Sequence, residues 1–145
     1  MSLGRGLVTL RGRWERAARG TDGRRFPWGN EPPDKTRCNC GNSIGHPSPV
    51  GVYPLGATPE GVHDLAGNVW EWTRSLWGTD PHSPGFSYPY DASDGREDVE
   101  EESENVCFVL RGGGFYNDPT LVRCAVRYVL NPGDFRLGFR VVVRP

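Results

Sequence analysis

The sequence predicts an α+β fold with short strands, little helix and extensive ordered loops. Glycine (20 residues) and proline (13 residues) make up nearly a quarter of the chain, so much of it must form turns and loops. Five Trp, six Phe and five Tyr supply large apolar side chains on which such loops can pack. Only a few short segments alternate between apolar and polar residues as strands do.

The first part of the chain contains one expected helix among turn-rich loops. Residues 7–10 are expected to form a short strand, and the segment WERAAR at 14–19 predicts a helix. Gly20 should end that helix, since glycine readily adopts the left-handed conformation of a C-terminal cap. From 21 to 61 no periodicity persists along the chain, which indicates an ordered loop.

The second part contains the strand-like segments. Residues 69–77 alternate, and we expect Trp70, Trp72 and Leu76 on the buried side. The loop 78–105 follows, and its acidic run is expected to be a solvated face or, as the weaker alternative, a cation site. Three further strands are expected, each β-branched or aromatic and bounded by glycine or proline: 107–115, 122–130 and 139–144.

The length suits one domain with a core of its own. A chain of 145 residues can bury about 68–70% of its unfolded surface, so no disulfide is required for stability. The four cysteines permit one or two disulfides, and their spacing does not assign the pairs. Cys38 and Cys40 are separated by one residue, which differs from the C-x-x-C of zinc and redox sites, so zinc is not expected.

Charge and hydropathy exclude several classes of partner. The formal net charge of -1 lacks the basic excess that binding to nucleic acid or an anionic membrane requires. The chain has no apolar run long enough to span a membrane, and its first residues lack the hydrophobic stretch of a signal peptide. We therefore expect no nucleic-acid partner, no membrane partner, and a cytoplasmic or otherwise unprocessed chain.

Four stretches of the sequence, in this order, resemble the formylglycine-generating-enzyme family, also called the sulfatase-modifying-factor family. The GNVWEW and GFR elements within them are highly specific, and the stretches lie at 14–30, 49–73, 88–98 and 109–142. The resemblance implies a C-type-lectin-like fold in which residues 1–145 form a single domain.

The resemblance also implies that the family's usual N-terminal portion is missing from this chain. That portion includes the strand that pairs with the C-terminal strand of the family's fold. We expect residues 7–10 to take its place and to pair with 139–143. Otherwise the terminal strand would leave an open edge for a second chain.

The chain departs from the family at the catalytic position. The family's enzymes bind copper with a pair of cysteines shortly after an R-G-G-S segment and oxidise a substrate cysteine to formylglycine. Here residues 111–121 contain no cysteine, and Gly114 stands where the family has serine. Copper(I) prefers soft thiolate ligands, so we expect no copper and no enzymatic activity. The resemblance implies that Cys124 is a structural disulfide partner or a buried thiol rather than a catalyst, and we expect a small core residue there.

The loop before W-E-W is the candidate metal site that the resemblance implies. It offers carboxylates at Asp64 and Glu71 and backbone carbonyls at Gly67 and Val69. Two carboxylates with backbone oxygens suit a hard cation, so we expect a structural Ca²⁺ there. In an equally weighted alternative, Asp64 caps a turn and Glu71 pairs with an arginine.

The segment 114–137 resembles the variable region of proteins from diversity-generating retroelements, which share this fold and vary that region to make a ligand-binding surface. Framework positions alternate there with freely chosen ones, and the framework positions are Pro119, Arg123, Ala125, Arg127 and Pro132. Rigid loops bearing Tyr, Asn, Asp and scattered apolar residues are typical of adaptable binding surfaces. The expected ligand-binding residues are Tyr116, Asn117, Asp118, Leu121, Val126, Tyr128, Leu130, Asn131, Asp134, Arg136 and Leu137.

Some of these positions fit a core equally well. Tyr116 and Tyr128 are the stronger candidates for the surface, whereas three aliphatic positions fit either environment: Val126, Val129 and Leu130. The two arginines Arg123 and Arg127 are expected to satisfy loop carbonyls, since a guanidinium donates several hydrogen bonds at once. The expected aromatic core anchors are Trp70, Trp72 and Phe139.

The function predicted from the sequence is a non-catalytic ligand-binding module of the retroelement variable-protein kind. It would recognise a protein or other macromolecular ligand through 114–137. The alternative is a formylglycine-generating-enzyme-like domain with a regulatory role or a residual small-ligand or oxidase role. An active oxidase with displaced metal ligands is the third and weakest hypothesis. The sequence makes no prediction of oligomeric state.

Overall fold

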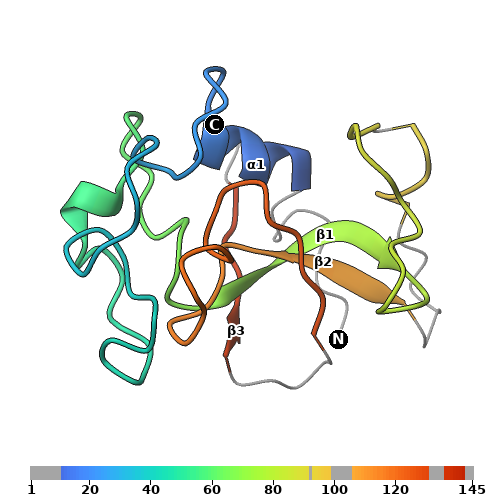
Figure 1. Ribbon diagram of the computed structural model, residues 1–145. Coiled ribbons are helices and arrows are strands. Elements are labelled where there is room, and N and C mark those ends of the chain that lie inside the picture. Colours follow the sequence, from blue (N-terminus) through green and yellow to red (C-terminus); the bar gives the residue numbers. More distant parts are fainter. Residues whose placement is uncertain (1–10, 92, 99–105, 131–135, 143–145) are drawn as a thin grey trace.

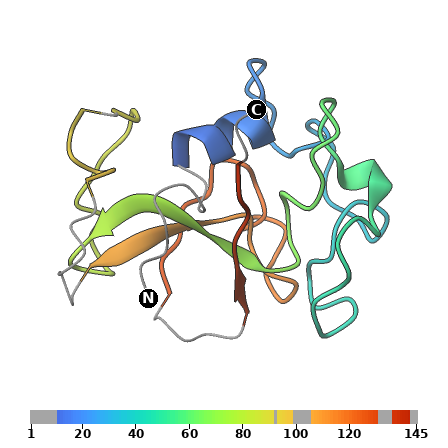
Figure 2. The same ribbon diagram turned by 180° about the vertical axis from the view of Figure 1, so that it is seen from behind.

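The computed structural model describes residues 11–91, 93–98, 106–130 and 136–142. Within these residues the elements are α1 (Arg11–Arg19), the 3-10 turn η1 (Pro54–Gly56), β1 (Trp70–Gly78), β2 (Cys107–Arg111) and β3 (Leu137–Gly138). Figures 1 and 2 show α1 beside the sheet, with the loops that precede β1 gathered at one end of it. This arrangement confirms the predicted α+β fold with little helix and extensive loops.

The helix α1 confirms the prediction for 14–19 and begins three residues earlier, at Arg11. Gly20 closes the helix as expected, because its amide donates to the carbonyl of Arg16 at 2.9 Å. Its φ of 62° lies in the left-handed region that favours glycine. At 9 residues α1 is far too short to span a membrane. No other helix in the described part of the chain is long and apolar enough to do so.

Two clusters of buried apolar side chains form the core. Leu65 and Ala66 are consecutive, and one belongs to each cluster, so the loop before β1 joins the two. Each large apolar side chain in these clusters contributes about 1.5–3 kcal/mol by burial. The first cluster consists of Trp14, Ala18, Leu65 and Cys124, and the second of Phe26, Ala66 and Val122.

The three strands form a sheet in the order β2-β1-β3. β1 and β2 are antiparallel, with Gly78 opposite Cys107, and the register shifts along β1 after Trp72. β1 and β3 are parallel, with Trp70 opposite Leu137. The sheet therefore brings Leu137 and Gly138 beside the start of β1.

The burial pattern of β1 differs from the predicted one. The apolar positions expected inside, Trp72 and Leu76, are half-buried, whereas the polar Thr73 and Ser75 are buried. The polar side chains can be buried because the fold supplies hydrogen-bond partners. The hydroxyl of Thr73, for example, donates to the carbonyl of Val109 at 2.8 Å.

The strands expected after β1 are shorter than predicted or absent. β2 ends at Arg111 because the glycines that follow turn the chain, beginning with Gly112 at a φ of 92°. Residues 122–130 form no strand, and one isolated bridge between Leu110 and Tyr128 links them to the sheet. Two carbonyl groups of this segment, those of Cys124 and Val126, accept hydrogen bonds from the side chain of Arg111 rather than from a neighbouring strand.

The end of the chain also corrects the prediction. The last strand lies at Leu137–Gly138, before the expected terminal strand. Phe139 is 66% exposed and is therefore not a core anchor. Its neighbour Arg140 turns inward to the carboxylate of Glu71, so the Phe139 side chain faces outward. The expected pairing partner at 7–10 lies outside the described residues.

The long loop before β1 is held by backbone hydrogen bonds to the segment after β2. The amide of Gly41 donates to the carbonyl of Asn117 at 2.8 Å, and the amide of Asn42 donates to the carbonyl of Phe115 at 2.8 Å. Paired backbone groups hold a loop in one conformation without a regular strand. This contact fixes the beginning of the predicted binding segment against a second loop.

Candidate ligand-binding surface

The predicted binding segment 114–137 follows β2, and its described residues 114–130 form the orange loops of Figure 1. Among the predicted ligand-binding residues that the structure describes, Asp118 and Tyr128 are exposed. The half-buried ones are Tyr116, Asn117, Leu121, Val126, Leu130, Arg136 and Leu137. Asn131 and Asp134 lie outside the described residues, as does the framework residue Pro132.

Tyr128 connects this surface to the core. Its backbone pairs with Leu110 in both directions, at 2.8 and 3.1 Å. Its ring stacks on the fully buried Trp70, with ring centroids 4.9 Å apart and planes 16° apart. Because Tyr128 is 40% exposed, one part of the ring packs on the core while the rest is open to solvent.

Tyr116 and Arg136 meet although they come from opposite ends of the segment. The guanidinium carbon of Arg136 lies 4.5 Å from the centroid of the Tyr116 ring, within cation–π range. The ring also lies edge-on to Phe115, with centroids 5.2 Å apart. The structure thus brings together two predicted binding residues, one near the start and one near the end of the segment 114–137.

Asn117 and Asp118 use side-chain oxygens to shape the loop. Oδ1 of Asn117 accepts a hydrogen bond from the amide of Gly114 at 2.7 Å. Oδ1 of Asp118 accepts one from the amide of Thr120 at 2.8 Å, and the hydrogen bonds from Thr120 lower the pKa of that carboxyl. These two residues therefore have a structural role in addition to the predicted binding role.

The arginines expected to satisfy loop carbonyls do so. Arg123 donates from Nε to the carbonyl of Thr120 at 2.6 Å, and Arg127 donates from Nη1 to the carbonyl of Phe86 at 3.1 Å. The guanidinium carbon of Arg127 also lies 5.0 Å from the centroid of the Trp77 ring. Both arginines hold loops in place, as predicted.

Arg111 is the structural residue that sequence reasoning missed. It is fully buried, and its Nη1 donates to the carbonyls of Cys124 at 3.2 Å and Val126 at 2.7 Å. Its Nη2 pairs with Glu15 of α1 at 2.5 Å. Its position between the apolar residues of β2 and the three glycines was the one sequence feature that could have indicated its burial. An arginine there must find buried acceptors if the strand is in the core.

The pKa of the Glu15 carboxyl reflects this buried network. Burial raises it, but the charge of Arg111 and hydrogen bonds from Tyr88, Arg19 and Arg111 outweigh burial, so the pKa is lowered overall. Glu15 therefore stays charged and joins the helix to β2 and to the loop that carries Tyr88.

The glycines after Arg111 are closely surrounded. A Cβ on Gly113, which has a φ of +78°, would lie 2.7 Å from Cγ1 of Val122. A Cβ on Gly114 would lie 2.7 Å from Cε1 of Tyr116. The Tyr116 ring thus fills the space that a serine side chain would need at position 114.

The four cysteines are free thiols in three separate places. Cys38 and Cys40 lie in the long loop with their Sγ atoms 3.4 Å apart. Cys124 is in the core beside Arg111, whereas Cys107 begins β2 and Arg111 ends it. The four residue steps from Cys107 to Arg111 span about 13 Å of strand. Cys124 is hydrogen-bonded to the Arg111 end of β2, so it lies toward the end of β2 opposite to Cys107.

The pKa values of the cysteine thiols also differ. Burial raises the pKa of Cys124 to about 12, which fits the predicted structural thiol. In the loop pair, the Cys38 thiol donates a hydrogen bond to the Cys40 sulfur. This bond lowers the pKa of Cys40 and raises that of Cys38.

The predicted calcium ligands are joined by an arginine. Arg140 donates to both carboxylate oxygens of Glu71, at 2.5 and 2.6 Å, and its Nη2 donates to the carbonyl of Asp64 at 3.0 Å. The Asp64 carboxylate accepts from the amide of Gly51 at 2.7 Å, and Trp14 also donates to Glu71 at 2.7 Å. A guanidinium therefore takes the place between these oxygens that a cation would need.

This donor set does not fit Ca²⁺ in the arrangement described. Glu71 pairs with an arginine, as in the alternative considered from the sequence. Within the described residues no three His, Cys, Asp or Glu side chains form a group that could hold a metal ion.

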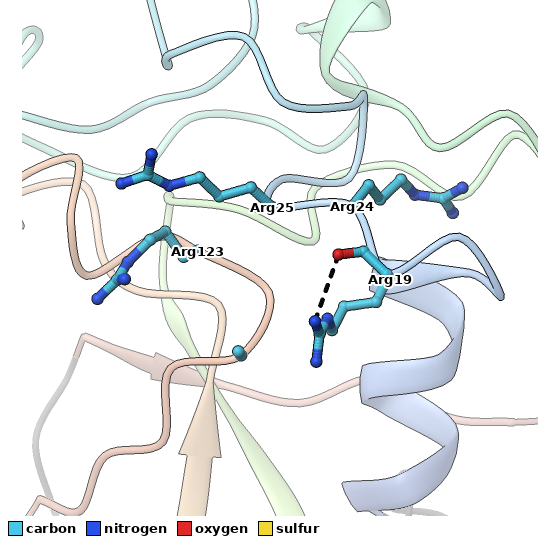
Figure 3. Close-up of a pocket in the computed structure, with 6 residues that line it drawn as sticks. Arg19, Arg24, Arg25 and Arg123 are labelled. Carbon is cyan, nitrogen blue, oxygen red and sulfur yellow. Dashed lines mark hydrogen bonds between the residues drawn. The ribbon is translucent and has the colours of Figure 1, made fainter.

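A separate pocket lies between the end of α1 and the middle of the predicted binding segment. Figure 3 shows Arg19, Arg24, Arg25 and Arg123 around it. Gly23 and Ala125 complete its lining. Sequence reasoning did not find this pocket, because only the fold brings Arg123 beside the arginines of 19–25.

Comparison with known protein families gives one match over nearly the whole chain. Residues 8–145 match the model of the sulfatase-modifying factor enzyme 1-like domain. The hercynine oxygenase of Mycobacterium tuberculosis is 36% identical over 115 residues, which are 72% of this chain and 23% of that protein. The formylglycine-generating enzyme of Thermomonospora curvata is 40% identical over 82 residues, 48% of this chain and 27% of that enzyme. The chain thus spans about a quarter of the length of these relatives.

Solved structures with the same fold include a variable protein. Treponema denticola variable protein 1 superimposes with a TM-score of 0.68 and 25% identity, covering 95% of this chain and 47% of that one. PvdO from Pseudomonas aeruginosa superimposes with a TM-score of 0.63 and 28% identity, covering 94% of this chain and 51% of that one. These neighbours confirm the predicted C-type-lectin-like fold.

Proposed function

Because the chain belongs to the sulfatase-modifying factor enzyme 1-like domain family, we propose that it is a ligand-binding domain of that family without oxidase activity. Its binding surface is the segment 114–137. Its ligand is a protein or another macromolecule. The domain is of the kind that diversity-generating retroelements vary.

The distribution of thiols carries the proposal. The family's enzymes hold copper with two cysteines after the arginine–glycine segment, and this chain has none between 111 and 121. Cys107 and Cys124 lie toward opposite ends of β2 and do not form a pair that could replace them. Cys38 and Cys40 form a pair but lie in the loop before β1. Copper(I) chemistry requires soft ligands at the reacting position.

The construction of the surface supports a binding role. Buried or scaffold groups hold its backbone: Arg111 and Arg123 donate to its carbonyls, and Tyr128 pairs with Leu110. On this frame, Tyr128 and Asp118 are exposed. A rigid frame lowers the entropy lost on binding, and aromatic side chains supply contact area with few rotatable bonds.

The likeness to Treponema denticola variable protein 1 supports the same proposal. It extends over 95% of this chain, so the binding segment and its frame are both included. That protein is a variable protein by name, and variation of a segment on a constant frame is what the alternation in 114–137 predicts.

The coding sequence provides the test. A retroelement-diversified gene has a near-repeat of the variable region beside a reverse transcriptase gene. We expect sequencing of the genomic region to show such a near-repeat of the codons for 114–137, with differences chiefly at adenines. A genomic region with neither the repeat nor the reverse transcriptase gene would contradict the proposal and favour the alternative below.

The alternative is a domain with a regulatory or residual small-ligand or oxidase role. The observation that favours it is the 36% identity to hercynine oxygenase over 72% of the chain. In related sulfoxide synthases an iron site uses histidines of a separate helical domain. The histidines here are His46, His63 and His82, and His46 and His82 are exposed in loops. Such a role would therefore require histidines from another domain or chain.

A further inference from the structure

The arginine-lined pocket has two walls of different character. Arg24 is 5% exposed and donates to the carbonyl of Ala18 at 2.9 Å. Its charge is balanced by Glu60 at 3.0 Å and Asp22 at 3.5 Å. Arg24 therefore belongs to the frame of the pocket, and in Figure 3 its guanidinium points away from Arg123.

Arg19 lies on the same wall, at the end of α1. Its Nη1 pairs with Glu15 at 3.1 Å, and its Nη2 donates to the carbonyl of Gly23 at 3.3 Å. The pair is i, i+4 on the helix and partly exposed, so it is weak. Glu15 is also shared with Arg111, which leaves the positive charge of Arg19 incompletely balanced.

Arg25 and Arg123 form the other wall and have no acidic partner among the residues that the structure describes. Arg25 is exposed and lies over the Phe26 ring at 5.6 Å. Arg123 uses Nε on the carbonyl of Thr120 and keeps both terminal nitrogens for other acceptors. Figure 3 shows the two guanidiniums extending toward the same side, away from Arg19.

The backbone holds these two arginines in a fixed relation. The amide of Cys124 donates to the carbonyl of Arg25 at 3.0 Å, so Arg123 and Arg25 come from chain segments that are directly hydrogen-bonded. Cys124 is fully buried below them and packs against Trp14 and Leu65 of the core. The base of the pocket is therefore rigid, whereas the arginine side chains above it can adjust to a ligand.

The two guanidiniums without an acidic partner in the described residues, Arg25 and Arg123, have the charge and the donors that suit a compact dianion. Planar guanidiniums donate pairs of hydrogen bonds that match the oxygens of phosphate. A phosphate monoester carries about -1.5 to -2 charges near neutral pH and three acceptor oxygens. We propose that a phosphoryl dianion, either free or as a monoester, binds at this pocket through Arg25 and Arg123, and that the partly balanced charge of Arg19 adds to the positive potential there. The site is independent of the proposed function.

The test is calorimetric titration of the protein with inorganic phosphate at constant ionic strength. We expect saturable binding of one ion, and binding at least about tenfold weaker in Arg25→Gln and in Arg123→Gln. Arg16→Gln is the matched control, since Arg16 is exposed on α1 and does not line the pocket. The control should bind within about twofold of the unchanged protein. Equal weakening in all three variants, or no saturable binding, would overturn the proposal.

The choice of anion tests the charge requirement. Phosphate should bind more tightly at pH 7.5 than at pH 5.5, because the fraction of the ion that is dianionic rises between these two pH values. Sulfate should bind without this pH dependence, and acetate should not compete. O-phosphoserine distinguishes the sources: binding as tight as that of phosphate assigns the site to phosphoryl groups on a larger molecule, and weaker binding assigns it to the free ion. Competition by acetate as strong as by sulfate would contradict a dianion site.

A second measurement does not depend on how a variant folds. Phenylglyoxal modifies accessible arginines, and mass spectrometry identifies each one. In the unchanged protein, phosphate should protect Arg25 and Arg123 several-fold and leave Arg16 unprotected. Equal protection of Arg16 would show nonspecific ion binding and would reject the site.

Discussion

Arg140 donates to both carboxylate oxygens of Glu71, at 2.5 and 2.6 Å. The indole of Trp14 donates to the same carboxylate at 2.7 Å. One buried acidic side chain on β1 thus joins the C-terminal segment and α1. The residue expected to bind a cation instead holds three distant parts of the chain together.

The first prediction concerns the Arg140–Glu71 pair. Replacing Arg140 with methionine leaves a buried carboxylate without its cation, and we expect a loss of about 3 kcal/mol in the free energy of unfolding. Urea unfolding measures it. Arg74→Met is the matched control, since Arg74 is half-buried on β1 with no ion pair in the described part of the chain. Its effect should be within about 0.5 kcal/mol. A loss for Arg140→Met no larger than that of the control would contradict the structural role.

Calcium should not stabilise the protein. The Arg140 guanidinium already neutralises Glu71 and bonds to the carbonyl of Asp64, so a cation would have to displace it. We expect the same Tm in millimolar Ca²⁺, in Mg²⁺ and in EDTA. A Tm that rises with Ca²⁺ but not with Mg²⁺ would show that Arg140 moves aside and that the calcium site expected from the sequence exists.

Glu15 should make stability depend on pH. Its pKa is lowered in the folded protein, so its stabilising contribution is present above the unfolded pKa of about 4.3 and is lost as pH falls through the folded pKa. We expect the difference in unfolding free energy between the unchanged protein and Glu15→Gln to be constant above about pH 5 and to shrink below about pH 4. Urea unfolding at several pH values measures it. A difference that does not change with pH would contradict the assignment.

Cys40 should be the most reactive thiol at moderate pH. The hydrogen bond from Cys38 lowers its pKa, whereas Cys124 is buried with a pKa of about 12. Alkylation by iodoacetamide, followed for each cysteine by mass spectrometry, should rise at lower pH for Cys40 than for an ordinary thiol. Cys38→Ala removes the donor and should move the midpoint for Cys40 upward. An unchanged midpoint would show that the Cys38 thiol does not control it.

The glycines after β2 should differ in their tolerance of a side chain. Gly113→Ala combines a positive φ with a Cβ 2.7 Å from Cγ1 of Val122 and 3.1 Å from the carbonyl oxygen of Leu121. We expect a loss of about 2 kcal/mol or more in unfolding free energy. Gly114→Ala meets the edge of the Tyr116 ring, which can move, so its loss should be smaller. Equal losses would mean that the segment is less tightly packed than described.

Local sequence features predicted the helix and its end. The apolar spacing of 14–19 and the glycine at 20 act over one or two helical turns, so neighbouring residues alone determine them. The fold class followed from the glycine, proline and aromatic content together with the one helical segment and the few short strand-like segments. The inward positions of β1 were not predictable in the same way, because Thr73 is buried by a partner at Val109, 36 positions away.

Most of the candidate site depended on long-range contacts. Arg111 is buried because its acceptors lie in the loop after β2 and on α1, and no local pattern contains those positions. Likewise, Phe139 has the apolar character of a core residue but is exposed, because Arg140 takes the inward position beside Glu71. Residues that satisfy distant polar groups are therefore the ones that composition and periodicity miss.

The most direct test of a ligand-binding role without oxidation is oxygen uptake. The purified protein, supplied with copper(I), is mixed with a sulfatase-derived peptide that contains the substrate cysteine, and dissolved oxygen is followed with an electrode. A peptide with alanine in place of that cysteine is the control. Because no thiol pair follows Arg111, we predict equal oxygen consumption with the two peptides. Copper-dependent uptake that requires the peptide cysteine would contradict the account.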